Sequence, residues 1–356
     1  MHPGQYAPGP GSVATPAAAA ASGIRQAPPG RPGMMAPMPE PTAAAVAPLP
    51  TSSQPMTQRG WTLFAVQSVI WGTPYLLISI AVESLSPVSV VAGRTSIAAL
   101  LLLPVALHQR ALGPALARQH LPWVLAFAAI EMAGPFLLLG HAEQSLPSGI
   151  TGLLVATVPI FGAVTAFVLG DRHALSRVRI VGMVVGLAGV ALVVGAASGD
   201  GEVHLRNVLE VLLVAVCYAI APFITYRKLG GVPGLGIAVV ALGAVGAAYL
   251  PAALLVEDGG VTARSATALG GLAVLCTSVA FVTFFALIRE VGPDRATLIT
   301  FVNPVVALLL GFVVLDETLS GGQLLGLPLV LAGCWLTTRR PPSEPVDEGP
   351  ILIPEP

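Results

Sequence analysis

Apolar residues fill long runs through most of this chain, and short polar breaks separate one run from the next. Each run is roughly 20 residues long, the length that an α-helix needs to cross about 30 Å of hydrocarbon. We therefore expect an all-α membrane protein with ten transmembrane helices. The predicted spans lie near 61–81, 87–107, 121–140, 147–169, 178–197, 207–226, 233–256, 266–288, 294–315 and 319–338.

Prolines fall inside several of these spans, among them Pro74, Pro159 and Pro304. They do not argue against helix here, because neighbouring helices can satisfy the backbone groups that a proline leaves free. Breaks of this kind are also where transporters build their sites.

The two ends of the chain have a different composition from the apolar middle. Residues 1–59 hold 13 of the 33 prolines, and 339–356 are acidic and rich in proline. Such segments lack the large apolar side chains of a packed core, so we expect two disordered tails. Between them, 60–198 and 206–338 would each form a five-helix unit.

Composition supports a membrane location. The chain is 54% hydrophobic and 10% charged, with a mean hydropathy of +0.82, whereas soluble domains carry about a quarter charged residues. A formal net charge of −1 gives no reason to expect nucleic acid as a partner. The three cysteines lie inside apolar runs without a CxxC spacing, and no motif calls for a cofactor.

Basic residues near the ends of the spans predict the orientation. With a cytoplasmic N-terminus, the inner side receives twelve Lys or Arg residues and the outer loops only Arg206 and Arg264. This is a strong positive-inside bias, which predicts a multi-pass plasma membrane protein with both termini in the cytoplasm. The inner basic residues are Arg59, Arg110, Arg118, Arg172, Arg177, Arg179, Arg227, Lys228, Arg289, Arg295, Arg339 and Arg340.

Two segments about 145 residues apart look like copies of one element with opposite charge. "VLGDRHALS" (168–176) and "VLDETLS" (314–320) each precede a run of spaced glycines, but the first is basic and the second acidic. An offset of five spans turns the second copy upside down, so the charge rule reverses its loop. We predict two inverted five-helix repeats, an architecture typical of transporters. The aligned positions are Pro159 with Pro304, Gly182 with Gly326 and Gly189 with Gly333.

The segments "WGTPYLLISIAVESLSPVSVVAGRTSIAALLLLPVAL" (71–107) and "GPDRATLITFVNPVVALLLGFVVLDETLSGGQLLGLPLVLAGCWL" (292–336) carry a resemblance to a known family. With the two five-helix halves, they resemble the EamA branch of the drug/metabolite transporter superfamily over about residues 60–338. The resemblance implies a ten-helix carrier with both ends in the cytoplasm, often an exporter of amino acids, amines or other metabolites. Arg94 matches the arginine in the family's second span, whereas Glu131 is not a recognised family feature.

Two charges, Arg94 and Glu131, lie deep inside predicted spans rather than near their ends. Arg94 and Glu131 would both sit roughly 10–14 Å below the outer surface, on neighbouring helices. A charge at that depth needs a partner or water. Arg94 would then bind a substrate carboxylate or Glu131 take up a proton; alternatively, the two form a static ion pair between the helices.

Four further residues are candidates for substrate binding. Trp71 and Tyr75 flank the break at Pro74, and Tyr218 lies in the inverted counterpart of that span. Asn303 precedes Pro304 and resembles the family's break in the ninth span. Packing explains each of them nearly as well. Glu210 fits a helix-capping box over 207–210, and the glycine-rich runs fit helix packing surfaces.

The sequence favours transport over the alternatives. The spans contain neither paired aspartates nor clustered histidines for an intramembrane enzyme, and no mid-membrane lysine for a retinal-type sensor. Without a phosphate-binding glycine loop, gradients rather than nucleotide hydrolysis would supply the energy. The expected function is a secondary transporter, not an enzyme, that exports small metabolites by alternating access. A passive channel stays open, as does a homodimer in the lipid bilayer.

Overall fold

The structure is a computed structural model that describes residues 56–198, 204–256 and 258–338 of the 356-residue chain. The predicted tails, 1–59 and 339–356, lie outside these residues except for 56–59. Helix α1 begins there, at Gln58, because the hydroxyl of Thr57 accepts a hydrogen bond from the amide of Gly60 at 2.9 Å and so caps the helix.

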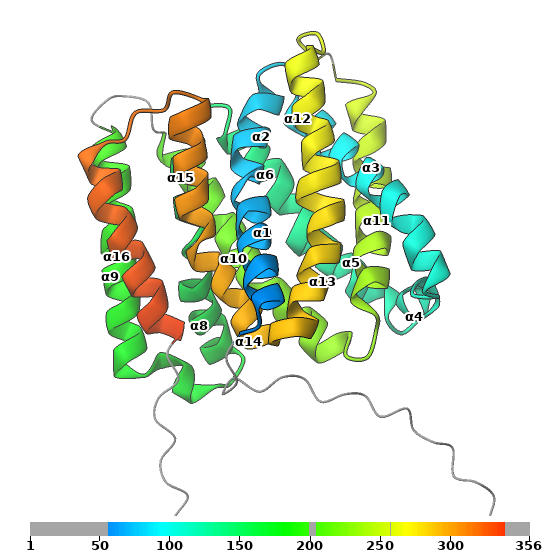
Figure 1. Cartoon of the computed structure of the whole chain (residues 1–356), viewed down its shortest axis with the longest axis horizontal. Helices are drawn as coiled ribbons and strands as arrows, with labels where there is room; N and C mark the ends of the chain where they lie inside the picture. The colour runs from blue at the N-terminus through cyan, green and yellow to red at the C-terminus, as the bar shows by residue number, and fades with distance from the viewer. Residues whose placement is uncertain (1–55, 199–203, 257, 339–356) are drawn as a thin grey trace, which may run out of the picture. The chain divides into compact units, whose positions relative to one another are not determined.

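All regular structure in the described residues is helical (Figure 1). The first half contains α1 (Gln58–Gly72), α2 (Pro74–Val82), α3 (Pro87–His108), α4 (Leu112–Leu116), α5 (Leu121–Phe127), the π-helix η1 (Ala128–Ala133), α6 (Gly134–Ala142), α7 (Ser148–Val155), α8 (Val158–Val168), the 3₁₀-helix η2 (Arg172–Leu175) and α9 (Arg177–Ser198).

The second half begins with a single long helix and also contains a π-helix. Its elements are α10 (Leu205–Lys228), α11 (Gly234–Ala253), α12 (Ala263–Ala273), the π-helix η3 (Val274–Val279), α13 (Ala280–Val291), α14 (Pro293–Ala296), the 3₁₀-helix η4 (Thr297–Phe301), α15 (Asn303–Val314) and α16 (Gly321–Thr338).

Nine helical stretches among the described residues are long and apolar enough to cross a membrane. They correspond to nine of the ten predicted spans. The stretch predicted at 294–315 is not one continuous helix, because α14 and η4 precede a break and α15 alone has 12 residues. The difference has a local cause: Pro304 lacks an amide hydrogen, so the chain turns through η4 before α15 starts.

A second break separates α7 from α8, just before Pro159. The thiol of Cys334 donates to the carbonyl of Ala156 there at 3.0 Å. At the other break, the side-chain amide of Asn303, with its nitrogen facing the two acceptors, donates to the carbonyls of Ile299 and Ser68 at 2.9 and 3.2 Å. Side chains thus satisfy backbone groups that the breaks leave free.

Three helix pairs hold the bundle together: α9 against α16, α3 against α11, and α7 against α15. The α9–α16 pair confirms that the glycine-rich runs are packing surfaces. A Cβ added at Gly333 would lie 2.5 Å from the Cα of Gly186 and 2.6 Å from the carbonyl oxygen of Gly182. Small residues permit this close approach of two backbones.

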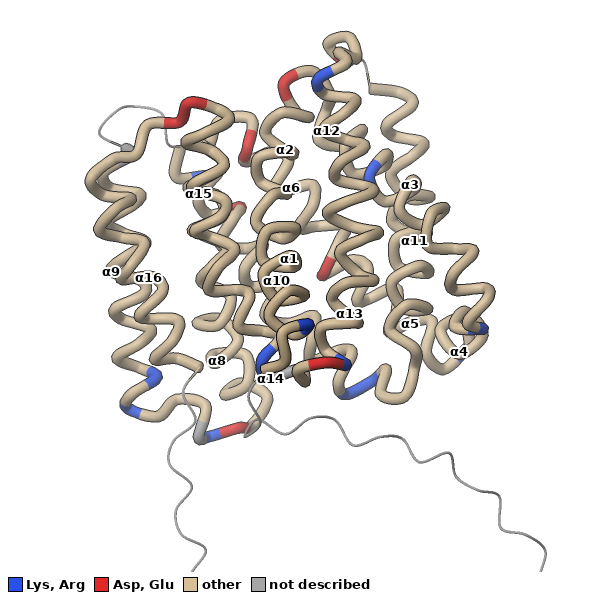
Figure 2. The backbone as a smooth tube through the Cα atoms, in the orientation of Figure 1, with Lys and Arg blue, Asp and Glu red and all other residues tan. Residues whose placement is uncertain are grey.

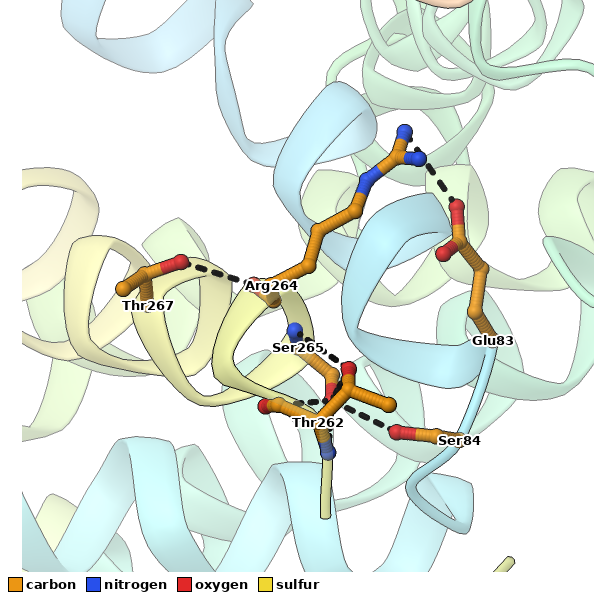
Figure 3. A network of polar contacts seen from close by, with 6 residues as sticks. All are labelled: Glu83, Ser84, Thr262, Arg264, Ser265 and Thr267. Carbon is orange, nitrogen blue, oxygen red and sulfur yellow. Dashed lines mark hydrogen bonds and ion pairs between the residues drawn. The ribbon is translucent and has the colours of Figure 1, made fainter. Parts of the chain in front are cut away.

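Charged residues concentrate at the ends of the bundle. Lys and Arg gather mainly at the end where α4 and α14 lie (Figure 2). At the opposite end, Arg264 pairs with Glu83 at 3.4 Å, and the hydroxyls of Thr262 and Ser265 cap α12 (Figure 3). Ser84 bonds to Ser265 at 2.5 Å, so this network ties the segment after α2 to the start of α12.

The predicted capping box at 207–210 is wrong. Helix α10 starts at Leu205, after His204, so Asn207 lies within its first turn and is buried. Glu210 instead accepts from Arg206 at 3.0 Å and contacts the Nδ1 of His141 at 2.7 Å. It therefore links α10 to α6.

Candidate functional site

Arg94 is a charged side chain buried among the helices. It lies on α3 with 6% of its surface exposed. Its Nε donates to the hydroxyl of Thr277 on η3 at 2.9 Å, and its guanidinium carbon lies 3.9 Å from the centre of the Phe136 ring on α6. In the described part of the chain, no carboxylate forms an ion pair with Arg94.

The π-helix η3 positions Thr277. A π-turn leaves backbone carbonyls without their usual helical partners. The hydroxyls of Thr277 and Ser278 donate to the carbonyls of Leu272 and Ala273, five residues earlier, at 2.8 and 2.9 Å. With its hydrogen engaged in this way, the Thr277 oxygen is an acceptor for Arg94. The arginine is thus held by one neutral hydrogen bond and one aromatic ring.

Glu131 lies on the other π-helix, η1, and is half-buried. The predicted alternative of a static ion pair with Arg94 is not formed. Its carboxylate makes no hydrogen bond or ion pair within the described residues. Tyr218 on α10 interacts electrostatically with both Glu131 and Arg94 and therefore lies near the two charges.

Tyr75 completes this group. It is 8% exposed, on α2. A Cβ added at Gly152 on α7 would lie 3.2 Å from its ring, so the ring packs against that glycine. It also interacts electrostatically with Arg94. The structure thus brings four of the six predicted residues together: Arg94, Tyr75 and Tyr218, with Glu131 beside Tyr218.

Trp71 and Asn303 lie in a different cluster. Trp71 packs against Phe284 with the ring centres 4.5 Å apart, in an apolar group that includes Leu287 and Ile299. Asn303 bonds to Ser68 on α1, near Trp71 in the sequence. These two residues tie α1 to α13 and to the break before α15.

The sequence did not reveal several buried polar groups. Thr277 is the hydrogen-bond partner of Arg94, and Gln67 accepts from Thr283, while its amide nitrogen has no partner in the part of the chain that the structure describes. Glu143, which directly follows α6, is 4% exposed, and within that same part neither of its carboxylate oxygens makes a hydrogen bond of good geometry. In the sequence, Gln67 and Thr277 stand out only as polar residues within apolar runs.

The site has no metal-binding chemistry that the structure can identify. Within the described ranges, no group of three or more His, Cys, Asp or Glu side chains could hold a metal ion. What the arrangement offers is a buried cation, a half-buried carboxylate and two tyrosines between α2, α3, α10 and the two π-helices.

Comparisons with known proteins agree with this picture. The model of the EamA-like transporter family matches residues 58–195 and again 205–339. YedA, an uncharacterized inner membrane transporter of Escherichia coli (strain K12), is 29% identical over 290 residues, covering 80% of this chain and 92% of YedA. A probable terminal-alkyne amino-acid exporter of Streptantibioticus cattleyicolor is 27% identical over 287 residues, covering 79% of this chain and 93% of the exporter.

A solved crystal structure has the same fold, with a TM-score of 0.56 at 21% identity. It covers 78% of this chain and 96% of its own. The two family-model matches together span most of the described residues, and the relatives are aligned over almost their whole length. This chain is therefore a multi-pass membrane transporter and belongs to the EamA-like transporter family.

Proposed function

We propose that this transporter is a secondary carrier that exports small metabolites bearing a carboxylate, such as amino acids, by alternating access. The observation that carries the proposal is Arg94, a buried guanidinium without a carboxylate partner in the described residues. A buried charge is costly unless it is paired. A guanidinium held by one hydroxyl and one ring retains donors for the planar, two-oxygen geometry of a substrate carboxylate.

Glu131 extends the proposal from carboxylates to amino acids. Arg94 and Glu131 are not paired with each other, yet Tyr218 interacts with both. A zwitterion would supply the missing partner of each charge, its carboxylate to Arg94 and its ammonium to Glu131. Tyr75 and Tyr218 would provide apolar ring surface with a polar tip between them. The exporter of S. cattleyicolor, named for an amino acid, supports this choice of solute.

Alternating access would use two inverted halves, 60–198 and 206–338, with the α14–η4–α15 stretch as the tenth crossing. The correspondence of elements at an offset of about 145 residues supports this. It relates α3 to α11, η1 to η3, and α9 to α16. The packing between the halves is also symmetric. Helix α1, which begins the first half, contacts α13 of the second half, and α10, which begins the second half, contacts α5 and η1 of the first. Such halves can open a central site to either side in turn.

The test of this function is exchange of radiolabelled solutes by the purified protein in sealed proteoliposomes. Three classes should be compared: amino acids, carboxylates without an amine, and amines without a carboxylate. We expect exchange of the amino acids and none of the amines, because only the amino acids carry a carboxylate that can pair with Arg94. Exchange of the amines alone would show that Arg94 does not select the solute.

We further propose that the end of the bundle with α4 and α14 faces the cytoplasm in the plasma membrane. Single cysteines at Gly113 and Gly259 can report this, because an added Cβ has no neighbour within 4 Å at Gly113 and only the Ser84 carbonyl, at 3.7 Å, at Gly259. In a background without Cys217, Cys276 and Cys334, an impermeant thiol reagent should label the Gly259→Cys protein in intact cells. Gly113→Cys should react only after permeabilisation. The reverse pattern would invert the topology.

A further inference from the structure

Two buried polar side chains and one partly buried carboxylate gather where α6 ends, α7 begins and α15 ends. They are Glu143, Ser148 and Glu317, and we call Glu143 and Glu317 the carboxyl pair. Glu143 is 4% exposed and Ser148 is fully buried, and among the described residues neither the Glu143 oxygens nor the Ser148 hydroxyl has a hydrogen-bond partner of good geometry. Unsatisfied buried polar atoms are rare in folded proteins and call for an explanation.

The two members of the carboxyl pair have opposite surroundings. Glu317 lies after α15, and its two oxygens accept from the backbone amides of Ser148 and Gly149 at 2.7 and 3.1 Å. It therefore binds the N-terminus of α7, where free amides and the helix dipole stabilise a negative charge. Glycine at 311 makes room for this, since a Cβ there would lie 2.8 Å from the Glu317 carboxyl carbon.

Glu143 has none of this support. It is buried, makes no hydrogen bond of good geometry within the described residues, and interacts unfavourably with the charge of Glu317. Burial and the charge of Glu317 raise the pKa of Glu143 well above its ordinary value, although the backbone of Ser79 and the positive charge of Arg94 oppose them. In this conformation Glu143 is therefore the protonated member of the pair and Glu317 the ionised one.

Titratable and charged groups reach the end of α6 from several elements. Helix α2 brings Tyr75, α3 brings Arg94, and the segment after α15 brings Glu317. On α10, Glu210 is engaged with His141 of α6 and with Arg206. No described cation forms an ion pair with Glu143, so a proton is the partner that its surroundings admit.

We propose that Glu143 is a proton-binding site that controls opening of this end of the bundle, with Glu317 as its ionised partner on the N-terminus of α7. The proposal deepens the alternating-access function and rests on it. With Glu143 protonated, Glu317 can hold α7 close to the end of α15, as the structure shows. Separating α7 from that segment would admit water, release the proton and leave two carboxylates that repel each other.

The sign of the pH effect follows from this arrangement. The pKa of Glu143 is higher in the closed conformation than in water, so the closed conformation binds more protons. Acidification on this side therefore stabilises the closed conformation and slows exchange. The effect approaches about tenfold per pH unit where opening requires loss of the proton.

The first test needs no substrate. Infrared spectra of the purified protein in lipid bilayers should show, at neutral pH, a protonated-carboxyl C=O band that disappears under alkaline conditions. Glu143→Gln should remove the part of this band that Glu143 contributes, whereas Glu83→Gln should leave the band unchanged, since Glu83 is a half-exposed glutamate paired with Arg264 at the same end. A spectrum of Glu143→Gln identical to that of the wild type would overturn the proposal.

A second variant provides an independent test if Glu143→Gln does not fold. Glu317→Gln removes the neighbouring negative charge, so the titration midpoint of the band should move to lower pH. Asp316→Asn removes an exposed charge from the adjacent residue and should leave the midpoint in place. An unmoved midpoint in Glu317→Gln would show that the two carboxyl groups are not coupled.

Exchange measurements then connect the proton to transport. Amino-acid exchange by the wild type should slow as this side is acidified, whereas exchange by Glu143→Gln should be slow at every pH because glutamine cannot ionise. Exchange by Glu143→Gln that keeps the wild-type pH profile would contradict the proposal. Should the wild type exchange no amino acid, the proposed solute class fails, and the infrared result still decides whether Glu143 binds the proton.

Discussion

Replacing Arg94 with glutamine is expected to abolish amino-acid exchange in proteoliposomes while leaving the protein folded. The variant loses the charge that pairs with the substrate carboxylate. Hydrogen bonds to charged groups contribute about 1.5–3 kcal/mol, so affinity should fall about tenfold to hundredfold. Folding should survive, because the hydroxyl of Thr277 keeps its own bond to the carbonyl of Leu272.

Arg264→Gln is the matched control. Arg264 has 57% of its side chain exposed and pairs with Glu83, and such a pair contributes about 0–1 kcal/mol. This variant should exchange amino acids at the wild-type rate. The double variant Arg94→Gln, Glu131→Gln should remain inactive, since the structure contains no ion pair for it to relieve. Undiminished exchange by Arg94→Gln would show that the solute binds elsewhere.

Replacing Gly333 with alanine is expected to cause the largest loss of stability. The added Cβ would meet the Cα of Gly186 and the carbonyl of Gly182, which are backbone atoms that cannot rotate away. Helices α9 and α16 would have to separate, and overpacking of this kind costs about 1–3 kcal/mol. Thermal unfolding in detergent, followed by fluorescence-detected size exclusion, should occur about 2–12 °C lower.

Gly195→Ala provides the comparison for this prediction. Gly195 also lies on α9, but an added Cβ there meets nothing within 4 Å. Alanine is the better helix former, so this variant should be as stable as the wild type or slightly more stable. Equal melting temperatures for the Gly333 and Gly195 variants would mean that the glycine contact does not limit how closely the two helices approach.

The predictable part of this protein is what the membrane imposes on its sequence. Long apolar runs identified nine crossings, and the charge of Arg94 inside such a run identified the centre of the candidate site. Tyr75 and Tyr218 were predicted from their place beside helix breaks or in the paired span. These signals work because hydrocarbon penalises a polar group wherever it stands in the sequence.

The remaining features depend on tertiary geometry that no local pattern records. No sequence signal marks the π-helices η1 and η3, in which Glu131 and Thr277 are surrounded mostly by apolar residues, yet η3 positions Thr277 for its bond with Arg94. The apolar run at 294–315 is long enough for a full span, so it gave no sign of the break before α15. The run predicted a span of full length, because hydropathy does not distinguish a helix from a 3₁₀ turn.

The reversed charge of the loop at 314–320 illustrates the same limit. The positive-inside rule explains why a carboxylate is tolerated there, and it led us to read Glu317 as an orientation signal. The structure shows that Glu317 also binds two amides at the start of α7. Glu143 falls in the polar break between the predicted spans 121–140 and 147–169, and the sequence gives no sign of its burial, because burial at a helix end is set by neighbours distant in sequence.

Counterflow is the most direct test of alternating access. Proteoliposomes loaded with an unlabelled amino acid are diluted into a trace of the same amino acid in labelled form, and internal label is followed over time. A carrier that exposes the Arg94 site to one side at a time should accumulate label transiently above its equilibrium level, and Arg94→Gln should not. Label that rises only to equilibrium in the wild type, without an overshoot, would contradict alternating access and indicate a passive channel.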